Sequence, residues 1–178
     1  VPEIVAWIPD PATIVMEWVE GGRDAGLIQH AIESGSQMTP DRWQASLTYM
    51  DRLAEVHAIP VERFVAAGAE LPSDNADLML ANFERFDTMG SDAGISDPFL
   101  AFMGGWLRRK CPQNRAGSAF LTGDCGQFLS DGPHATCLMD FEIGHIGDPM
   151  RDLSCYRGRH PIENMGDLPA LFERYAKA

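Results

Sequence analysis

The stretch AFLTGDCGQFLSDGPHATCLMDFEIGHIGDP, residues 119–149, decides the fold of this chain. An apolar run over residues 119–121 leads to Asp124, and two further apolar segments flank a Ser-Asp-Gly-Pro turn at residues 130–133. Turn-forming residues between short apolar runs predict a tight β-hairpin. Asp124 precedes this hairpin and Asp140 directly follows it, 16 positions later.

Two carboxylates at the ends of one hairpin suit phosphoryl transfer. That reaction needs one carboxylate to accept or orient the proton of the attacking hydroxyl, and another to hold magnesium on the ATP phosphates. A rigid hairpin between them would fix their separation, which such positioning demands. The spacing therefore indicates a carboxylate pair with divided roles.

A second hairpin is predicted at the start of the chain. Two β-branched runs, residues 4–8 and 13–19, are separated by Pro9-Asp10-Pro11. Two strands do not make a stable sheet by themselves. Because the sequence also begins at Val1 without an initiator Met, we expect that the rest of this sheet has been cut away.

Helices are expected in most of the remaining chain. The best marked begins at Thr39, a capping residue, with Pro40 in the first helical position and Asp41 near the positive helix end. Asp148-Pro149 caps another. The expected helices cover residues 39–59, 75–85, 97–110, 149–157 and 168–178, and residues 140–147 are expected to form a polar loop.

Length and composition fit one compact domain with an ordinary core. The 178 residues are 45% hydrophobic and 22% charged. The net charge of −12 argues against a nucleic-acid partner, which requires clustered Lys and Arg. No apolar stretch approaches the roughly 20 residues that span a bilayer, and the start lacks the basic region of a signal peptide. The four cysteines form no CxxC pair, which indicates reduced thiols in a cytoplasmic protein.

Four segments together resemble the aminoglycoside phosphotransferase family. LTGDCGQFL (121–129) and CLMDFEIGHIGDPMRDL (137–153) resemble its catalytic and metal-binding segments. VMEWVEGG (15–22) is similar to the hinge between its lobes, and LAEVHAIP (53–60) to the long helix of its C-terminal lobe. A Gly-Asp pair alone is weak evidence for this family, but the order and intervals of these motifs together are specific to it. The resemblance covers about residues 1–160.

The resemblance implies an α+β, protein-kinase-like fold. Residues 1–22 would be the end of the N-terminal lobe sheet and the hinge. Residues 23–178 would be a mostly helical C-terminal lobe with a small catalytic hairpin. Both lobes would be truncated.

The implied activity is that of an ATP-dependent O-phosphotransferase, a kinase, acting on a small hydroxylated molecule. In the family's pattern Asp124 would be the catalytic base or the carboxylate that orients the nucleophile, and Asp140 the main magnesium ligand. Gln127 would stand where the family has a second metal-ligating Asn. The side-chain carbonyl of Gln can also bind magnesium. Main-chain groups of three hinge residues would receive the adenine ring: Glu17, Trp18 and Val19.

Three departures from the family pattern affect activity. Thr122 replaces the family's His before Gly-Asp, and the loop after Asp124 is about two residues shorter. No segment supplies the phosphate-binding loop or the nucleotide-binding Lys of the small lobe. We therefore expect this chain by itself to bind ATP poorly and to be inactive.

Two other functions stay open on the sequence. The departures are also compatible with a catalytically weak or inactive kinase-like nucleotide-binding module. A metal-dependent hydrolase could use Asp140, Glu142, His145 and Asp148, although the helix-capping position of Asp148 argues against this.

The sequence also suggests structural roles for Asp152 and His57. Asp152 either stabilises the positive end of its helix or braces the catalytic loop through hydrogen bonds. His57 is interpreted as a satisfied core histidine.

Overall fold

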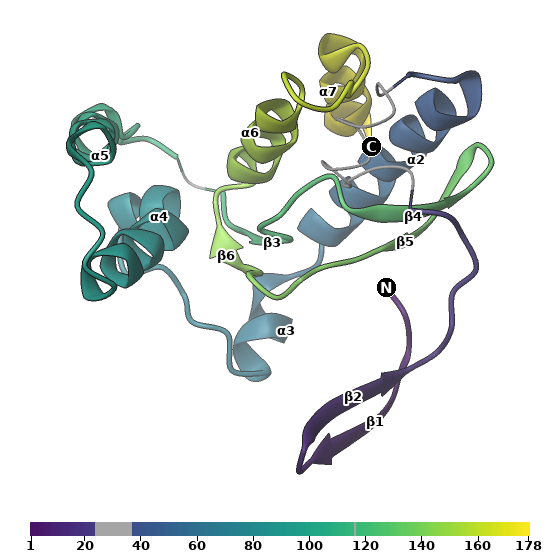
Figure 1. The fold of residues 1–178 in the computed structure, drawn as a ribbon, viewed down its shortest axis with the longest axis horizontal. Coiled ribbons are helices and arrows are strands. Elements are labelled where there is room, and N and C mark those ends of the chain that lie inside the picture. Colours follow the sequence, from purple (N-terminus) through teal and green to yellow (C-terminus); the bar gives the residue numbers. More distant parts are fainter. Residues whose placement is uncertain (24–36, 116) are drawn as a thin grey trace. The chain divides into compact units, whose positions relative to one another are not determined.

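The computed structural model describes residues 1–23, 37–115 and 117–178. The chain divides into two compact units. The first comprises residues 1–55, 124–142 and 153–178, and the second comprises residues 56–123 and 143–152. Both units combine helices with antiparallel strand pairs (Figure 1). The chain is therefore α+β, as predicted. The division into lobes at residue 22 stays a prediction.

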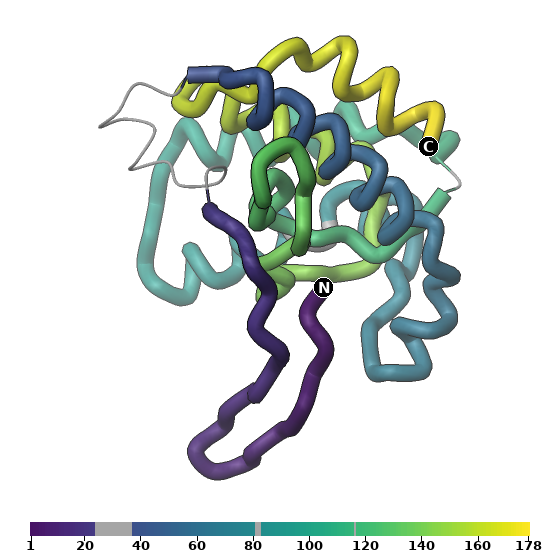
Figure 2. Tube along the Cα trace, turned by 90° about the vertical axis from the view of Figure 1, so that its right-hand side faces the viewer, coloured from purple at the N-terminus to yellow at the C-terminus, as the bar shows by residue number. Residues whose placement is uncertain are grey.

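The first unit begins with the expected N-terminal hairpin (Figure 2). Strand β1 (Ile4–Pro9) pairs antiparallel with β2 (Ala12–Met16), and Trp7 lies opposite Ile14. Every side chain of both strands is exposed. The second strand ends at Met16, so the three residues predicted to form the hinge follow it as a non-strand segment.

Helix α2 (Pro40–His57) starts where the sequence predicted. The Arg42 N–H donates to Thr39 Oγ1 at 3.1 Å, which caps the first turn. Its buried face includes Tyr49, whose ring stacks on Phe128 and Tyr156 at centroid distances of 4.8 and 5.8 Å. These stacked rings form the centre of the first unit's core.

The hairpin predicted between Asp124 and Asp140 is also confirmed. Strands β4 (Phe128–Asp131) and β5 (His134–Leu138) pair antiparallel, and a two-residue Gly132-Pro133 loop joins them. Inward-facing residues of both strands are buried. Helices α6 (Met150–Arg159) and α7 (Leu168–Lys177) follow at the expected places.

The second unit holds the elements that the sequence predicted least well. It contains α3 (Val61–Ala66), α4 (Asn75–Asp92), α5 (Pro98–Lys110), β3 (Ala119–Leu121) and β6 (His145–Gly147). Strands β3 and β6 pair antiparallel. Helix α3 was not expected, and α4 extends seven residues past its predicted end, from residue 85 to residue 92. Strand β6 lies in a segment that the sequence predicts as a loop. The short strand forms by pairing with β3, and its own residues show no strand pattern.

Helix α5 starts at an Asp97 cap, whose Oδ1 accepts the Phe99 and Leu100 N–H groups. Its predicted aromatic side is mostly exposed: Phe99 is 67%, Phe102 61% and Trp106 44% exposed. Within the described parts of the chain, no helix is both long enough and apolar enough to cross a membrane.

Candidate active site

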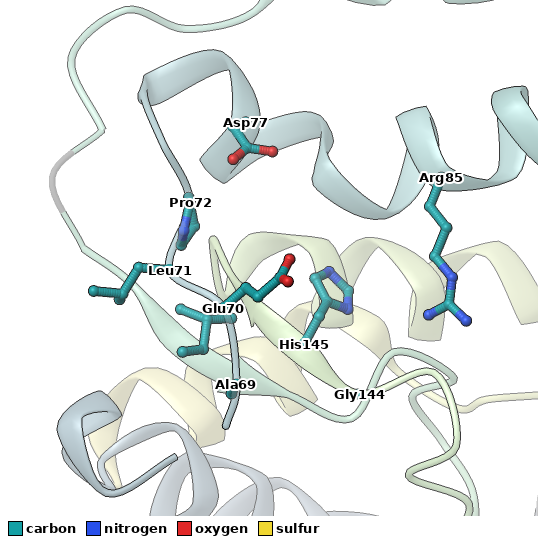
Figure 3. A pocket seen from close by; sticks show the side chains of 9 residues that line it. Ala69, Glu70, Leu71, Pro72, Asp77, Arg85, Gly144 and His145 are labelled. Atoms are coloured by element: carbon teal, nitrogen blue, oxygen red, sulfur yellow. The ribbon is translucent and has the colours of Figure 1, made fainter. Parts of the chain in front are cut away.

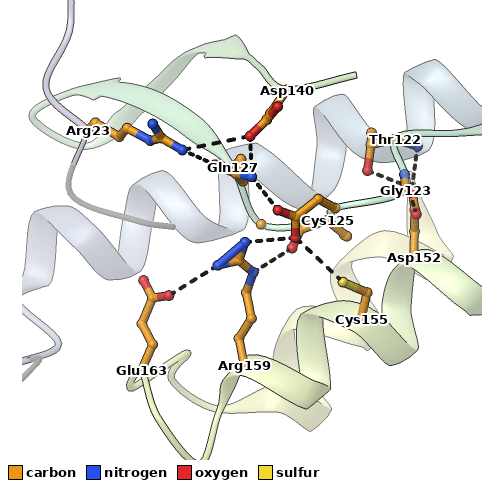
Figure 4. A network of polar contacts seen from close by, with 12 residues as sticks. Arg23, Thr122, Gly123, Cys125, Gln127, Asp140, Asp152, Cys155, Arg159 and Glu163 are labelled. Atoms are coloured by element: carbon orange, nitrogen blue, oxygen red, sulfur yellow. Dashed lines mark hydrogen bonds and ion pairs between the residues drawn. The ribbon is translucent and has the colours of Figure 1, made fainter. Parts of the chain in front are cut away.

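The two predicted carboxylates lie at the same open end of the β4–β5 hairpin. Because the strands are antiparallel, the residue before β4 lies beside the residue after β5, and the Met139 N–H donates to the Gln127 carbonyl at 3.1 Å. The Gln127 side-chain amide then donates to Asp140 Oδ2 at 2.5 Å and to Asp124 Oδ2 (Figure 4). The structure thus brings together the three residues assigned to catalysis and metal binding.

Asp140 is held in an unusual backbone conformation. Its φ is +66°, and among the described residues no other non-glycine residue has a positive φ. This left-handed region is disfavoured for residues with a Cβ, although Asp and Asn tolerate it best. Such strain persists where the surroundings impose it, often at functional sites. The backbone here fixes where the Asp140 carboxylate points.

The oxygens at this site suit magnesium. Magnesium keeps several waters and is bound through one or two carboxylates plus substrate phosphates. The Gln127 Oε1 accepts from Arg23. Turning the amide by half a turn would aim Oε1 at the two carboxylates. The Asp140 carboxylate and the Gln127 carboxamide therefore fit a magnesium ion held jointly with a nucleotide.

Asp124 has a charged partner that the sequence did not predict. Arg159 Nη2 lies 2.8 Å from Asp124 Oδ1, and Arg159 Nε donates to the Cys125 carbonyl at 3.0 Å. The Arg159 side chain is 8% exposed, whereas that of Asp124 is 37% exposed. Asp124 is therefore accessible to a substrate, while the buried Arg159 orients its carboxylate.

A buried carboxylate stands behind Arg159. Glu163 Oε2 lies 3.8 Å from Arg159 Nη1, and Glu163 Oε1 accepts from Arg42 Nη2 at 2.9 Å. The Glu163 side chain is 1% exposed. These side chains alternate in charge from Arg42 to Asp124, and no local motif in the sequence marks them as a set.

Tyr49 of helix α2 supports the turn that follows Asp124. The Gly126 N–H donates to Tyr49 Oη at 2.8 Å, and Tyr49 Oη lies 3.0 Å from Cys125 Sγ. Burial raises the pKa of the neighbouring Tyr156 well above its usual range. The turn between Asp124 and Gln127 is thus held by side chains from α2 and α6.

In the second unit, Asp152 braces the backbone that leads into Asp124. Its carboxylate accepts the Thr122 N–H at 2.8 Å, the Thr122 hydroxyl at 2.9 Å and the Gly123 N–H at 3.1 Å (Figure 4). Burial opposes ionisation, but hydrogen bonds from His57 and Thr122 outweigh it and lower the pKa of Asp152. Of the two readings of Asp152, the structure supports the bracing role.

His57 is a satisfied buried histidine, as predicted. Its side chain is 4% exposed, and its Nε2 lies 3.2 Å from Asp152 Oδ2. It contacts the same Asp152 carboxylate that braces the backbone before Asp124.

Asp148 has a structural role. It accepts two hydrogen bonds from Arg115, at 2.6 and 2.9 Å, and the Met150 N–H at 2.8 Å. The last of these caps α6, as predicted.

His145 is also committed elsewhere. Its Nδ1 lies 3.0 Å from the Ile143 carbonyl, and burial lowers its pKa. It lines a separate cavity of about 430 Å³ in the second unit, together with Glu70 and Arg85 (Figure 3). In the described part of the chain no three His, Cys, Asp or Glu side chains form a metal-binding group, and the hydrolase alternative required such a group.

The three predicted hinge residues line a larger cavity in the first unit. It has a volume of about 870 Å³, and Asp140 also lines it. Most of its lining is apolar, from β1, β2, β4 and β5. The Glu17 N–H donates to the Glu3 carbonyl at 3.0 Å, so Glu17 has only its carbonyl to offer an adenine ring.

No protein-family profile and no curated protein sequence matches this chain. Several solved structures, however, are similar to it. A macrolide 2′-phosphotransferase from Brachybacterium faecium superposes with a TM-score of 0.68 at 17% identity, over 99% of this chain and 57% of its own. A protein from Ralstonia eutropha, described as an aminoglycoside phosphotransferase, gives 0.67 at 18% over 99% and 59%. APH(2″)-IIa with streptomycin and ATP gives 0.64 at 13% over 98% and 59%.

These structures identify the fold. The chain spans 57–59% of the length of the three neighbours. At identities of 13–18% the likeness concerns the fold, and the neighbours are all antibiotic phosphotransferases or described as such. The chain therefore has the kinase-like fold of the aminoglycoside and macrolide phosphotransferases, as the motifs at Asp124 and Asp140 predicted.

Proposed function

We propose that this chain carries the catalytic part of an ATP-dependent phosphotransferase that acts on a hydroxyl group of a small molecule. The observation that carries the proposal is the convergence of Asp124, Gln127 and Asp140 at the open end of one hairpin. Asp140 also lines the large cavity beside the hinge. Nucleotide and phosphoryl-transfer groups are then adjacent within the first unit.

Each residue has a separate task in this proposal. Asp124 accepts or orients the proton of the attacking hydroxyl. Asp140 and Gln127 would hold magnesium, which neutralises charge on the ATP phosphates when bound. Asp152 keeps the backbone before Asp124 in place through three hydrogen bonds.

The nucleotide would bind in the apolar cavity. The main chain of Glu17, Trp18 and Val19 would face the adenine ring, while residues 1–22 act as the end of the N-terminal lobe and the hinge. The acceptor is proposed only as a small hydroxylated molecule. A cytoplasmic location is part of the proposal, because the four cysteines are all free thiols.

The test is Asp124→Asn in a protein that also carries a complete N-terminal lobe, assayed for ATP-dependent phosphoryl transfer to hydroxylated acceptors found by screening. Asn keeps the shape of Asp but takes no proton. Turnover should fall by about 10²-fold or more, while nucleotide affinity stays near that of the parent. Asp131→Asn, at the exposed far end of the same hairpin, is the matched control. Equal turnover in the Asp124→Asn variant and the parent would refute the catalytic assignment.

A second candidate is an inactive nucleotide-binding module. Thr122 favours it, because its hydroxyl is bonded to Asp152 where the related motif has a His. This reading predicts ATP binding without turnover in the parent, and Thr122→His would then be the first change to restore transfer.

A further inference from the structure

The Asp124 and Asp140 carboxylates share one amide but have different cationic neighbours. Gln127 Nε2 donates to both. Arg159 lies 2.8 Å from Asp124 Oδ1, whereas Arg23 lies 3.9 Å from Asp140 Oδ2. Cys155 Sγ also faces Asp124 Oδ1, at 3.9 Å. One carboxylate is tightly paired and the other only loosely.

The two arginines also differ in how firmly they are held. The Arg159 side chain is 8% exposed, and its Nε is bonded to the Cys125 carbonyl. Behind it lies Glu163, itself paired with Arg42. Arg23 is 37% exposed. A buried, hydrogen-bonded guanidinium is costly to displace, while an exposed one is screened by water and moves at little cost.

We propose that Arg159 divides the roles of the two carboxylates. It is a positioning residue that keeps Asp124 off the metal, so that only Asp140 and Gln127 serve as protein ligands. A divalent cation on the Asp124 carboxylate would lie close to a fixed positive charge, because Arg159 Nη2 is 2.8 Å from Oδ1 of the same carboxylate. The inference deepens the proposed function and rests on its metal site.

Mn²⁺ alone is the probe, titrated against the full chain by isothermal calorimetry. Without Arg159, Asp124 is free to join the metal as an extra ligand. Arg159→Met should therefore tighten Mn²⁺ binding by about 5- to 10-fold, the scale of one added charge interaction near the protein surface. Arg157→Met is the matched control, because Arg157 is exposed on the same helix. It should leave the affinity unchanged.

A double-mutant cycle separates this mechanism from a simple loss of positive charge. If Arg159 acts through Asp124, adding Arg159→Met to Asp124→Asn should change Mn²⁺ affinity by less than about 2-fold, since the freed ligand is absent. An equal gain in both backgrounds would overturn the proposal. So would weaker or unchanged Mn²⁺ binding in Arg159→Met alone.

Folding of each variant is checked by thermal melting. If Arg159→Met does not fold, Arg159→Lys replaces it. Lys keeps the charge that faces Glu163 but lacks the fork that holds Asp124 and the Cys125 carbonyl together. It should give a smaller gain in Mn²⁺ affinity, and a loss of affinity would overturn the proposal.

The failure of this inference is distinguishable from failure of the proposed function. Tighter Mn²⁺ binding in Arg159→Met, with no ATP binding or transfer by the parent even when it carries a complete N-terminal lobe, supports the division of roles and refutes the kinase proposal. A parent that binds no Mn²⁺ refutes both. In an active parent, Arg159→Met should lower kcat while the acceptor KM stays unchanged, because only Asp124 is displaced.

Discussion

At the scale of single residues, Asp140 combines a side chain proposed to bind metal with a strained backbone. Asn tolerates the left-handed region as well as Asp does, but offers no charge to a metal. We expect Asp140→Asn to keep the parent's stability and lower ATP affinity in magnesium by about 10-fold or more. Affinity measured in EDTA should be equal in the two proteins. An Asn variant with undiminished magnesium-dependent binding would assign Asp140 a structural role.

The backbone conformation of Asp140 also predicts how replacing it by Gly changes the stability of the chain. Asp140→Gly relieves the left-handed strain, so it should raise the free energy of unfolding in urea by up to about 1 kcal/mol. Asp131→Gly, at an exposed strand position, should lower it instead. A destabilised Asp140→Gly protein would mean that the side-chain contacts of Asp140 outweigh its backbone strain.

Asp152 makes the stability of the second unit depend on pH. Its pKa is lowered in the folded chain, so its contribution is present above the unfolded pKa of about 3.9. The contribution is lost as the pH falls through the lower, folded pKa. Asp152→Asn should cost about 2 kcal/mol or more at pH 7, since hydrogen bonds to an ionised group are lost.

The measurement for Asp152 is urea unfolding from pH 7 to pH 2. The Asn variant should show a flatter decline below about pH 4 than the parent, because it no longer titrates there. Asp131→Asn, at an exposed position, should follow the parent curve. Parallel curves for the parent and Asp152→Asn would show that Asp152 does not govern acid unfolding.

Local motifs predicted some of the site's residues and missed others for a physical reason. Asp124 and Asp140 lie beside glycines and apolar strands whose order is informative in itself. Arg159 and Glu163 become meaningful only through contacts with distant segments, such as the pair that joins Arg42 to Glu163 across 121 positions. No spacing rule applies to such a pair, because the fold creates it.

At the scale of elements, helix α2 supports the turn after Asp124 through the Tyr49 hydroxyl. Tyr49→Phe removes the acceptor of the buried Gly126 N–H and should cost about 1–3 kcal/mol in stability. Because the turn holds Asp124, turnover should fall as well. Tyr156→Phe is the matched control, since that buried ring lies in the same stack. It should destabilise the chain without the same loss of turnover per molecule folded.

The elements that were predicted correctly carry their own start and stop signals. Thr39 caps α2, and the β4–β5 hairpin contains its own turn. The sequence does not predict helix α3, because Pro60 reads as the end of one helix but is also the N-cap position of the next. Strand β6 has three residues and no pattern of its own. It depends on β3, which lies more than twenty positions earlier.

At the scale of the whole molecule, apolar side chains are exposed on several elements. Trp7 is 60% exposed on β1 and Trp18 is 84% exposed after β2, and α5 exposes Phe99 and Phe102. Residues 1–178 prepared alone should therefore bind a hydrophobic dye such as ANS, because large exposed apolar patches attract apolar ligands. Replacing Phe99 and Phe102 by Ser should reduce the fluorescence. A chain that melts cooperatively and binds no dye would contradict the prediction.

The alternating row from Arg42 through Glu163 and Arg159 to Asp124 has an evolutionary consequence. Losing one member leaves the charge of its buried neighbour only partly compensated. Single replacements therefore lower the stability, while concerted replacements are tolerated. Lineages should therefore inherit these positions as a set. In an alignment of relatives, a neutral residue at the position of Glu163 should accompany replacement of Arg42, while exposed Arg157 drifts independently of both.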